Sequence, residues 1–197
     1  MTSTQLISIA VLAVFIFWAV GAYNRLVRLK NTIANAFGQI DVQLKRRYDL
    51  IPNLVEAAKK YLSHERETLE AVITARAQAK SASEAARSRP ANALAVTTLA
   101  VAEQALSSSL GQLFALNEAY PELKADKTIS DLSEELTSTD NKVAFARQAF
   151  NDAVLDYNNA QGQFPALLIA RLFGFAPSAM LQATENAQEK KAVRIAM

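Results

Sequence analysis

The chain has 197 residues, a formal net charge of +2 at pH 7, no cysteine, 5 glycines and 5 prolines. The lack of cysteine excludes a disulfide framework, a thiolate nucleophile and a cysteine-based zinc site. Acidic and basic residues are interspersed, which gives little electrostatic support for nucleic-acid binding, so we expect no nucleic-acid partner. Strong helix formers dominate from Asn24 onward, and this composition predicts an all-α fold.

An uncharged run, LISIAVLAVFIFWAVGA, extends from Leu6 to Ala22. Its 17 apolar or small residues meet the lower end of the roughly 17 to 25 that cross a bilayer. Aromatic residues at its end suit the membrane interface. Residues 1–22 are therefore predicted to form a transmembrane anchor in the lipid bilayer, with contacts that include Leu6, Phe15, Phe17, Trp18 and Tyr23.

A cleavable secretory signal is the alternative interpretation of this run. Val20 and Ala22 are small residues at the spacing that a signal peptidase accepts. The preceding residues, MTSTQ, carry no basic side chain, whereas a signal peptide begins with a positively charged region. We therefore favour a retained anchor.

Basic side chains cluster on the C-terminal side of the run only. By the positive-inside rule this asymmetry favours a single-pass protein whose C-terminal domain is cytoplasmic. A periplasmic domain is the alternative, because long domains cross the membrane largely regardless of their flanking charges. The basic residues in question are Arg25, Arg28, Lys30, Lys45, Arg46 and Arg47.

The sparse prolines divide the remainder of the chain into helices. Pro52 fits either a turn or a kink inside one longer helix. Pro90 suits a first helical residue, with Ser88 as a capping candidate. Ser130 or Thr128 is expected to cap the last helix. We predict one helix from the membrane to about residue 48, and others over residues 52–87, 90–120 and 130–164.

Two of these predicted helices carry extended heptad patterns. The pattern predicts shallow packing of long helices, so residues 23–176 are expected to form an elongated, up-and-down, antiparallel four-helix bundle behind the transmembrane helix, with a polar C-terminal tail over residues 177–197. The rows are Leu99, Ala102, Leu106, Ser109, Leu113, Leu116 and Tyr120, then Leu136, Val143, Phe150, Tyr157 and Phe164, and beside it Leu132, Thr139, Ala146, Ala153 and Ala160.

The densest charged patch contains Lys45, Arg46 and Arg47, a candidate surface for an acidic partner or a lipid headgroup. Pairing within the helix is the favoured interpretation. Asp41 can pair with Lys45 four residues later, and Asp49 can pair with Arg46.

The segment from Ala166 to Phe175, ALLIARLFGF, is strongly apolar but too short to cross a bilayer. It needs a cover, which can be the end of the bundle, a neighbouring subunit or the membrane interface. We rank packing on the bundle first. Its candidate interaction residues are Leu168, Arg171, Phe173 and Phe175.

No catalytic motif stands above background, so we expect a non-enzyme without cofactor or metal. His64 is the only histidine, and no second histidine follows it at the spacing of a metalloprotease motif. A bundle that binds a metal or other ligand through Glu56 and Glu118 is a third, disfavoured hypothesis, because di-metal bundles use Glu-x-x-His pairs.

Three segments carry a family resemblance: YNRLVRLKNTIANAFGQIDVQLKRRYDLIPNLVEAAKKYLSHE from Tyr23, then EAYPELKAD, then FPALLIARLFGF. The chain resembles the LemA family over essentially its whole length. The resemblance implies a bundle of long helices behind a membrane anchor in the bacterial inner membrane. A magnetosome-membrane protein is similar to this family, which implies a part in shaping or organising membrane.

The preferred functional hypothesis is a membrane-anchored helical scaffold that forms a homo-oligomer and organises or remodels membrane, or recruits envelope proteins. Its basis is the heptad rows, the unassigned apolar segment and the lack of a catalytic set. The alternative is a monomeric tethered adaptor that presents one helix face to a membrane or envelope protein.

Overall fold

The computed structural model describes residues 3–181, apart from the side chains of Asn117 and Glu118. Every regular element in this part of the chain is a helix, which confirms the predicted all-α fold. The helices are α1 (Ser3–Lys59), α2 (Arg66–Ser88), α3 (Ala93–Ala119), α4 (Pro121–Ala125), α5 (Lys127–Gly162) and α6 (Ala166–Leu172).

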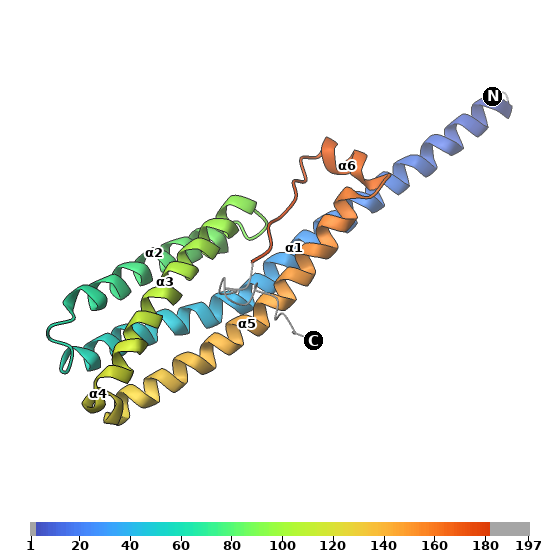
Figure 1. Cartoon of the computed structure of the whole chain (residues 1–197). Helices are drawn as coiled ribbons and strands as arrows, with labels where there is room; N and C mark the ends of the chain where they lie inside the picture. The colour runs from blue at the N-terminus through green and yellow to red at the C-terminus, as the bar shows by residue number, and fades with distance from the viewer. Residues whose placement is uncertain (1–2, 182–197) are drawn as a thin grey trace, which may run out of the picture.

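The long helices α1, α2, α3 and α5 run up and down to form the elongated bundle, and the N-terminal part of α1 projects beyond its end (Figure 1). α5 packs along α1, and α2 packs along both α1 and α3. In contrast, α3 and α5 do not pack closely along their length. The bundle is therefore two helix pairs joined through α1 and α2.

Pro52 lies inside α1, which continues without interruption from Ser3 to Lys59. Of the two interpretations of this proline, the turn is wrong, and so is the predicted helix end near Tyr48. At about 1.5 Å per residue the 57 residues of α1 span roughly 85 Å. The chain reverses instead between Lys59 and Arg66, so α2 starts later than predicted.

The heptad rows of α5 face the bundle interior, as their spacing predicts. Leu136, Val143 and Phe150 are buried, and the ring of Phe150 lies 5.8 Å from that of Phe37 in α1. Small residues of the second row, such as Ala153, are buried beside them. Phe164, the last predicted member, comes after the end of α5 and is exposed.

The helix caps differ from those predicted. Asn92, rather than Ser88, caps α3, and its side chain accepts a hydrogen bond from the backbone N–H of Ala95. Asp126 caps α5 in place of Ser130 or Thr128. An aspartate at this position accepts hydrogen bonds from backbone N–H groups of the first turn. Its negative charge also interacts favourably with the positive end of the helix dipole.

The segment after α6 runs back along the bundle rather than leaving it. The Asn158 amide both donates to and accepts from the backbone of Ser178, with both distances 2.9 Å. Asn151 forms the same pair of bonds with Leu181, also at 2.9 Å. The first residues of the predicted tail thus lie against α5, whereas residues 182–197 of that tail lie outside the described part of the chain.

Candidate functional site

The predicted anchor residues lie in the projecting part of α1. Leu6, Phe15 and Phe17 are exposed, and none of the most apolar stretch of α1 is buried by other parts of the molecule. An uncharged helix of this length that packs against nothing is suited to a bilayer. Trp18 and Tyr23 lie at the end of this stretch, where α1 enters the bundle. The N-terminal helix therefore points to membrane anchoring.

α3 is also long and apolar enough to cross a membrane by length and composition. It packs along α2, however, and its Leu99, Leu106 and Leu113 are buried in the core. We therefore interpret α3 as a core helix of the bundle.

The candidate interaction residues fall into two separate regions. Lys45, Arg46 and Arg47 lie in the middle of the bundle, whereas the α6 residues lie beside Tyr23. Between Tyr23 and Lys45 the axis of α1 advances by roughly 33 Å. The two groups of candidates cannot form one surface.

Lys45 and Arg46 are exposed but paired. The Lys45 ammonium lies 2.6 Å from Asp41, which confirms the expected pairing within the helix. Arg46 pairs with Glu135 of α5 rather than with Asp49. Both side chains of the Arg46–Glu135 pair are exposed to solvent, and such pairs contribute little to stability. Part of the cationic patch is thus already neutralised within the chain.

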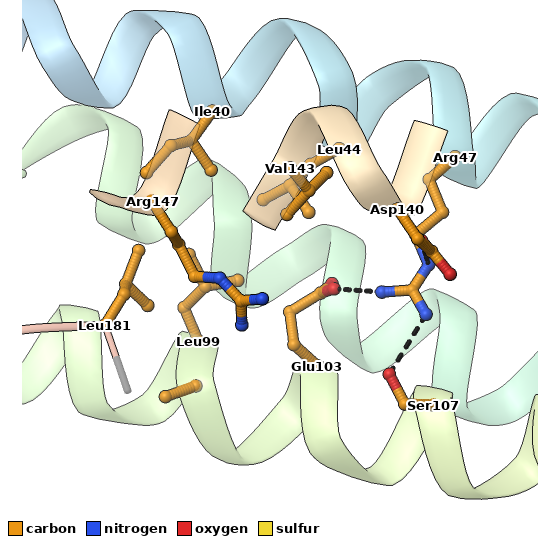
Figure 2. Close-up of a pocket in the computed structure, with 11 residues that line it drawn as sticks. Ile40, Leu44, Arg47, Leu99, Glu103, Ser107, Asp140, Val143, Arg147 and Leu181 are labelled. Atoms are coloured by element: carbon orange, nitrogen blue, oxygen red, sulfur yellow. Dashed lines mark hydrogen bonds and ion pairs between the residues drawn. The ribbon is translucent and has the colours of Figure 1, made fainter. Parts of the chain in front are cut away.

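Arg47 is not a surface residue, since only 6 % of its side chain is exposed. Its guanidinium donates to Glu103 of α3 at 2.6 Å and to Ser107 at 3.0 Å (Figure 2). Its Nε also lies 3.0 Å from Asp140 of α5, as an ion pair without hydrogen-bond alignment. The predicted role of Arg47 in an interaction surface is wrong, because the side chain points into the bundle.

Glu103 holds a second buried group, since the Tyr48 hydroxyl donates to its carboxylate at 2.5 Å. Burial and the neighbouring Glu103 carboxylate raise the pKa of Tyr48, so this hydroxyl keeps its proton and stays a donor. Arg47, Tyr48, Glu103 and Asp140, together with Arg147, form what we call the central ionic cluster.

The central ionic cluster borders a cavity of about 110 Å³ between α1, α3 and α5. In Figure 2 the Arg47 and Arg147 guanidinium groups lie on either side of Glu103. Burial raises the pKa of Asp140, while the two arginines oppose this change. Burial also lowers the pKa of Arg147. Two cations and two carboxylates balance, so the cavity has no strong preference for a charged ligand.

This cluster is best explained as a structural contact. It fills the space where α3 and α5 do not pack closely, and buried ion pairs of this kind can fix one alignment of helices. Among the described residues no group of three or more His, Cys, Asp and Glu side chains could hold a metal ion. His64 is exposed in the turn after α1, Glu56 pairs with Lys59 at 3.0 Å, and Glu118 lies outside the described side chains.

Sequence reasoning missed Glu103 and Asp140 as partners of Arg47, and Arg147 as a second cation beside them. One signal was present for Arg47 itself, because it follows Ile40 and Leu44 at the spacing of a buried helix stripe. No sequence signal specified its partners, since they come from two other helices.

The end of the bundle nearest the anchor is apolar and partly exposed. The Tyr23 ring lies 4.9 Å from that of Phe173 and 5.6 Å from that of Phe175. Leu168 and Arg171 project from α6 and are exposed. Only the buried face of α6, with Ile169 and Ala170, is therefore covered by the bundle.

Sequence comparisons with known proteins identify the family of the chain. A sequence model of the LemA family matches residues 36–196. The chain is also similar to Protein LemA of Metamycoplasma hominis, at 24 % identity over 177 residues that cover 90 % of this chain and 76 % of that protein. The match extends over the bundle and the segment that follows α6, so the chain belongs to the LemA family.

Proposed function

We propose that the protein is a non-enzymatic, membrane-anchored scaffold whose bundles associate side by side to organise or remodel membrane. The observation that carries the proposal is the continuity of α1, which passes from the apolar anchor into the bundle without a break. A continuous helix transmits the position of the bundle directly to the anchor, whereas a flexible linker would uncouple them. Association of bundles would then order the anchors in the bilayer.

The heptad rows do not explain such association, because they are used inside the bundle. Other apolar side chains are better placed for it. Val42 of α1 is 60 % exposed and Phe145 of α5 is 79 % exposed. The Phe37–Phe150 contact sets the antiparallel register of α1 and α5, which places Val42 level with Phe145. We expect this pair to contribute to a contact between two copies of the chain.

The proposed location is the bacterial inner membrane, with the bundle in the cytoplasm. The cluster of basic residues that follows the anchor, including Arg25, Arg28 and Lys30, supports this orientation. A periplasmic bundle is the alternative. The chain has no cysteine, so a Ser138→Cys variant carries a single thiol. Ser138 is exposed on α5, where a maleimide can reach it. Protection from a membrane-impermeant maleimide in intact cells would support a cytoplasmic bundle, whereas labelling would contradict it.

A monomeric adaptor for a membrane or envelope protein is the second candidate function. It would use the same exposed α1 and α5 side chains, but with a different partner. The two candidates differ in the mass of the purified assembly.

The experiment is to extract the full-length protein into lipid nanodiscs and determine its mass and shape. We expect a multimer in which the double variant Val42→Ser/Phe145→Ser shifts the mass towards the monomer. Leu94→Ser is a matched control, because Leu94 is an equally exposed apolar residue on α3. A wild-type monomer, or a multimer that the double variant leaves intact, would contradict the proposed contact, and the monomer would favour the adaptor.

A further inference from the structure

The membrane-proximal end of the bundle carries four exposed apolar side chains beyond the anchor itself. They lie in α6 and the turns at its two ends, next to the point where α1 leaves the bundle (Figure 1). Phe164 is 79 % exposed and Leu172 is 76 % exposed. We call Phe164, Leu168, Leu172 and Phe173 the α6 foot.

The α6 foot is level with the end of the anchor. Trp18 and Gly21 of α1 line a cleft of about 320 Å³ together with Phe164 and Pro165 from the turn before α6. On the other side of α6, the Phe173 ring contacts Tyr23. Both ends of α6 thus touch the last turns of the apolar stretch, in which aromatic residues suit the membrane interface.

Charge supports the same position. Arg25, Arg28 and Lys30 follow the anchor along α1 and are exposed, and Arg171 is exposed on α6 itself. Cations placed just outside an apolar surface can reach phosphate groups of lipids while their side-chain stems stay against the apolar region. The α6 foot therefore combines apolar side chains with Arg171 beside them and with cations that follow along α1.

We infer that the α6 foot is a second membrane contact, which lies in the interfacial region of the leaflet from which α1 emerges. The occupant of this apolar surface is lipid rather than a second copy of the chain, because the surface continues directly from the apolar anchor at Trp18 and Tyr23. The inference rests on membrane anchorage through α1 but does not require self-association.

Attachment through both α1 and the α6 foot would fix the orientation of the bundle relative to the membrane. A single helix leaves the bundle free to tilt and rotate with the helix, whereas a contact beside it selects one side of the bundle to face the bilayer. The α6 foot also occupies area in one leaflet only. An interfacial helix of this kind is sensitive to membrane curvature, which would link the bundle's orientation to membrane shape.

The test uses the full chain in liposomes, with one cysteine introduced at a time and labelled with an environment-sensitive fluorophore. Leu172→Cys reports on the α6 foot and Val14→Cys on the anchor. Val101→Cys is the control, because Val101 is an exposed apolar residue on α3, which packs along α2 rather than beside the anchor. Each label is exposed to lipids that carry a quencher near the headgroup, which reaches position 172, or along the acyl chain, which reaches position 14, and separately to aqueous iodide.

We expect lipid quenching of the labels at positions 172 and 14, and none at position 101. Lipid quenching at position 14 but not at position 172 would overturn the α6 foot and leave the anchor intact. Protection of position 172 from both quenchers would also overturn it, because protein would then cover the surface. Loss of lipid quenching at position 14 would overturn the anchorage on which the scaffold also depends.

Discussion

The Arg76 guanidinium of α2 donates from Nε to the backbone carbonyl oxygen of Tyr48 in α1, at 2.6 Å. This carbonyl is the one that residue 52 would normally bind, because helix hydrogen bonds join residue i to residue i−4. Pro52 has no N–H to donate. Arg76 thus replaces the missing hydrogen bond and joins α2 to α1 at the same point.

The first prediction is that Arg76→Ala destabilises the bundle, by about 1–3 kcal/mol, because it leaves a partly buried carbonyl without its charged donor. In a Pro52→Ala background the cost of losing Arg76 should be smaller, since the alanine amide can donate to the Tyr48 carbonyl. The measurement is a double-mutant cycle of urea unfolding on the full chain in detergent. Equal costs of Arg76→Ala in both backgrounds would contradict this role.

The second prediction concerns Glu103, which binds both Arg47 and Tyr48. Glu103→Ala should destabilise the bundle by about 3 kcal/mol, because it leaves a buried guanidinium with fewer partners. Glu135→Ala is the control, since it removes the partner of exposed Arg46 and should cost less than about 1 kcal/mol. Thermal unfolding followed by circular dichroism compares the two variants. Similar losses would show that the central ionic cluster has no special energetic role.

Arg76 and Arg47 show what the sequence could and could not predict. The prolines placed α3 and α5 to within a few residues, and the heptad spacing located the buried rows of α5, because both signals are local. The sequence left Pro52 open between a turn and a kink, because the donor that replaces its missing hydrogen bond, Arg76, lies 24 residues further along the chain. Arg47 looked like its neighbours Lys45 and Arg46, but partners on α3 and α5 decide that it is buried.

The third prediction is a pH dependence that arises from Asp126. The Tyr61 hydroxyl donates to its carboxylate at 2.8 Å, and this bond, with the backbone N–H groups of Ile129 and Thr128, lowers the pKa of Asp126. A lowered pKa in the folded state means that the contribution is complete above the unfolded pKa of about 3.9 and is lost as pH falls through the folded value.

Asp126→Asn isolates this effect, because asparagine can still cap α5 but carries no charge. We expect the variant to be less stable than the wild type at neutral pH and to approach it as the pH falls through the lowered folded pKa of Asp126, where the wild-type carboxyl becomes protonated. Stability is compared between the variant and the wild type at each pH because Asp140 also titrates. Burial raises the pKa of Asp140, and a raised pKa changes stability with pH in the direction opposite to that of Asp126. The measurement is the urea unfolding midpoint of both proteins at about a dozen pH values between roughly 2.5 and 7. A constant difference across that range would contradict the prediction.

The last prediction concerns the segment that α5 holds after α6. The Tyr157 hydroxyl donates to the Ala176 carbonyl at 2.9 Å, between the Asn158 pair with Ser178 and the end of α6. Ser178 in turn donates to the Ala91 carbonyl at 2.9 Å, so this segment ties α5 to the turn between α2 and α3. Side-chain to backbone bonds, together with the burial of Leu181 in the core, therefore hold this segment.

Asn158→Ala should release this segment while the bundle stays folded, because the other long helices do not depend on the Asn158 amide. Hydrogen exchange followed by mass spectrometry should show faster exchange over residues 174–181, with little change in α1 and α2. Asn159→Ala is the matched control, since Asn159 is the neighbouring residue but is exposed on α5. If the segment were held by Leu181 packing alone, both variants would exchange at the wild-type rate. Faster exchange confined to Asn158→Ala would instead show that polar bonds from α5 hold the segment after α6 against the bundle.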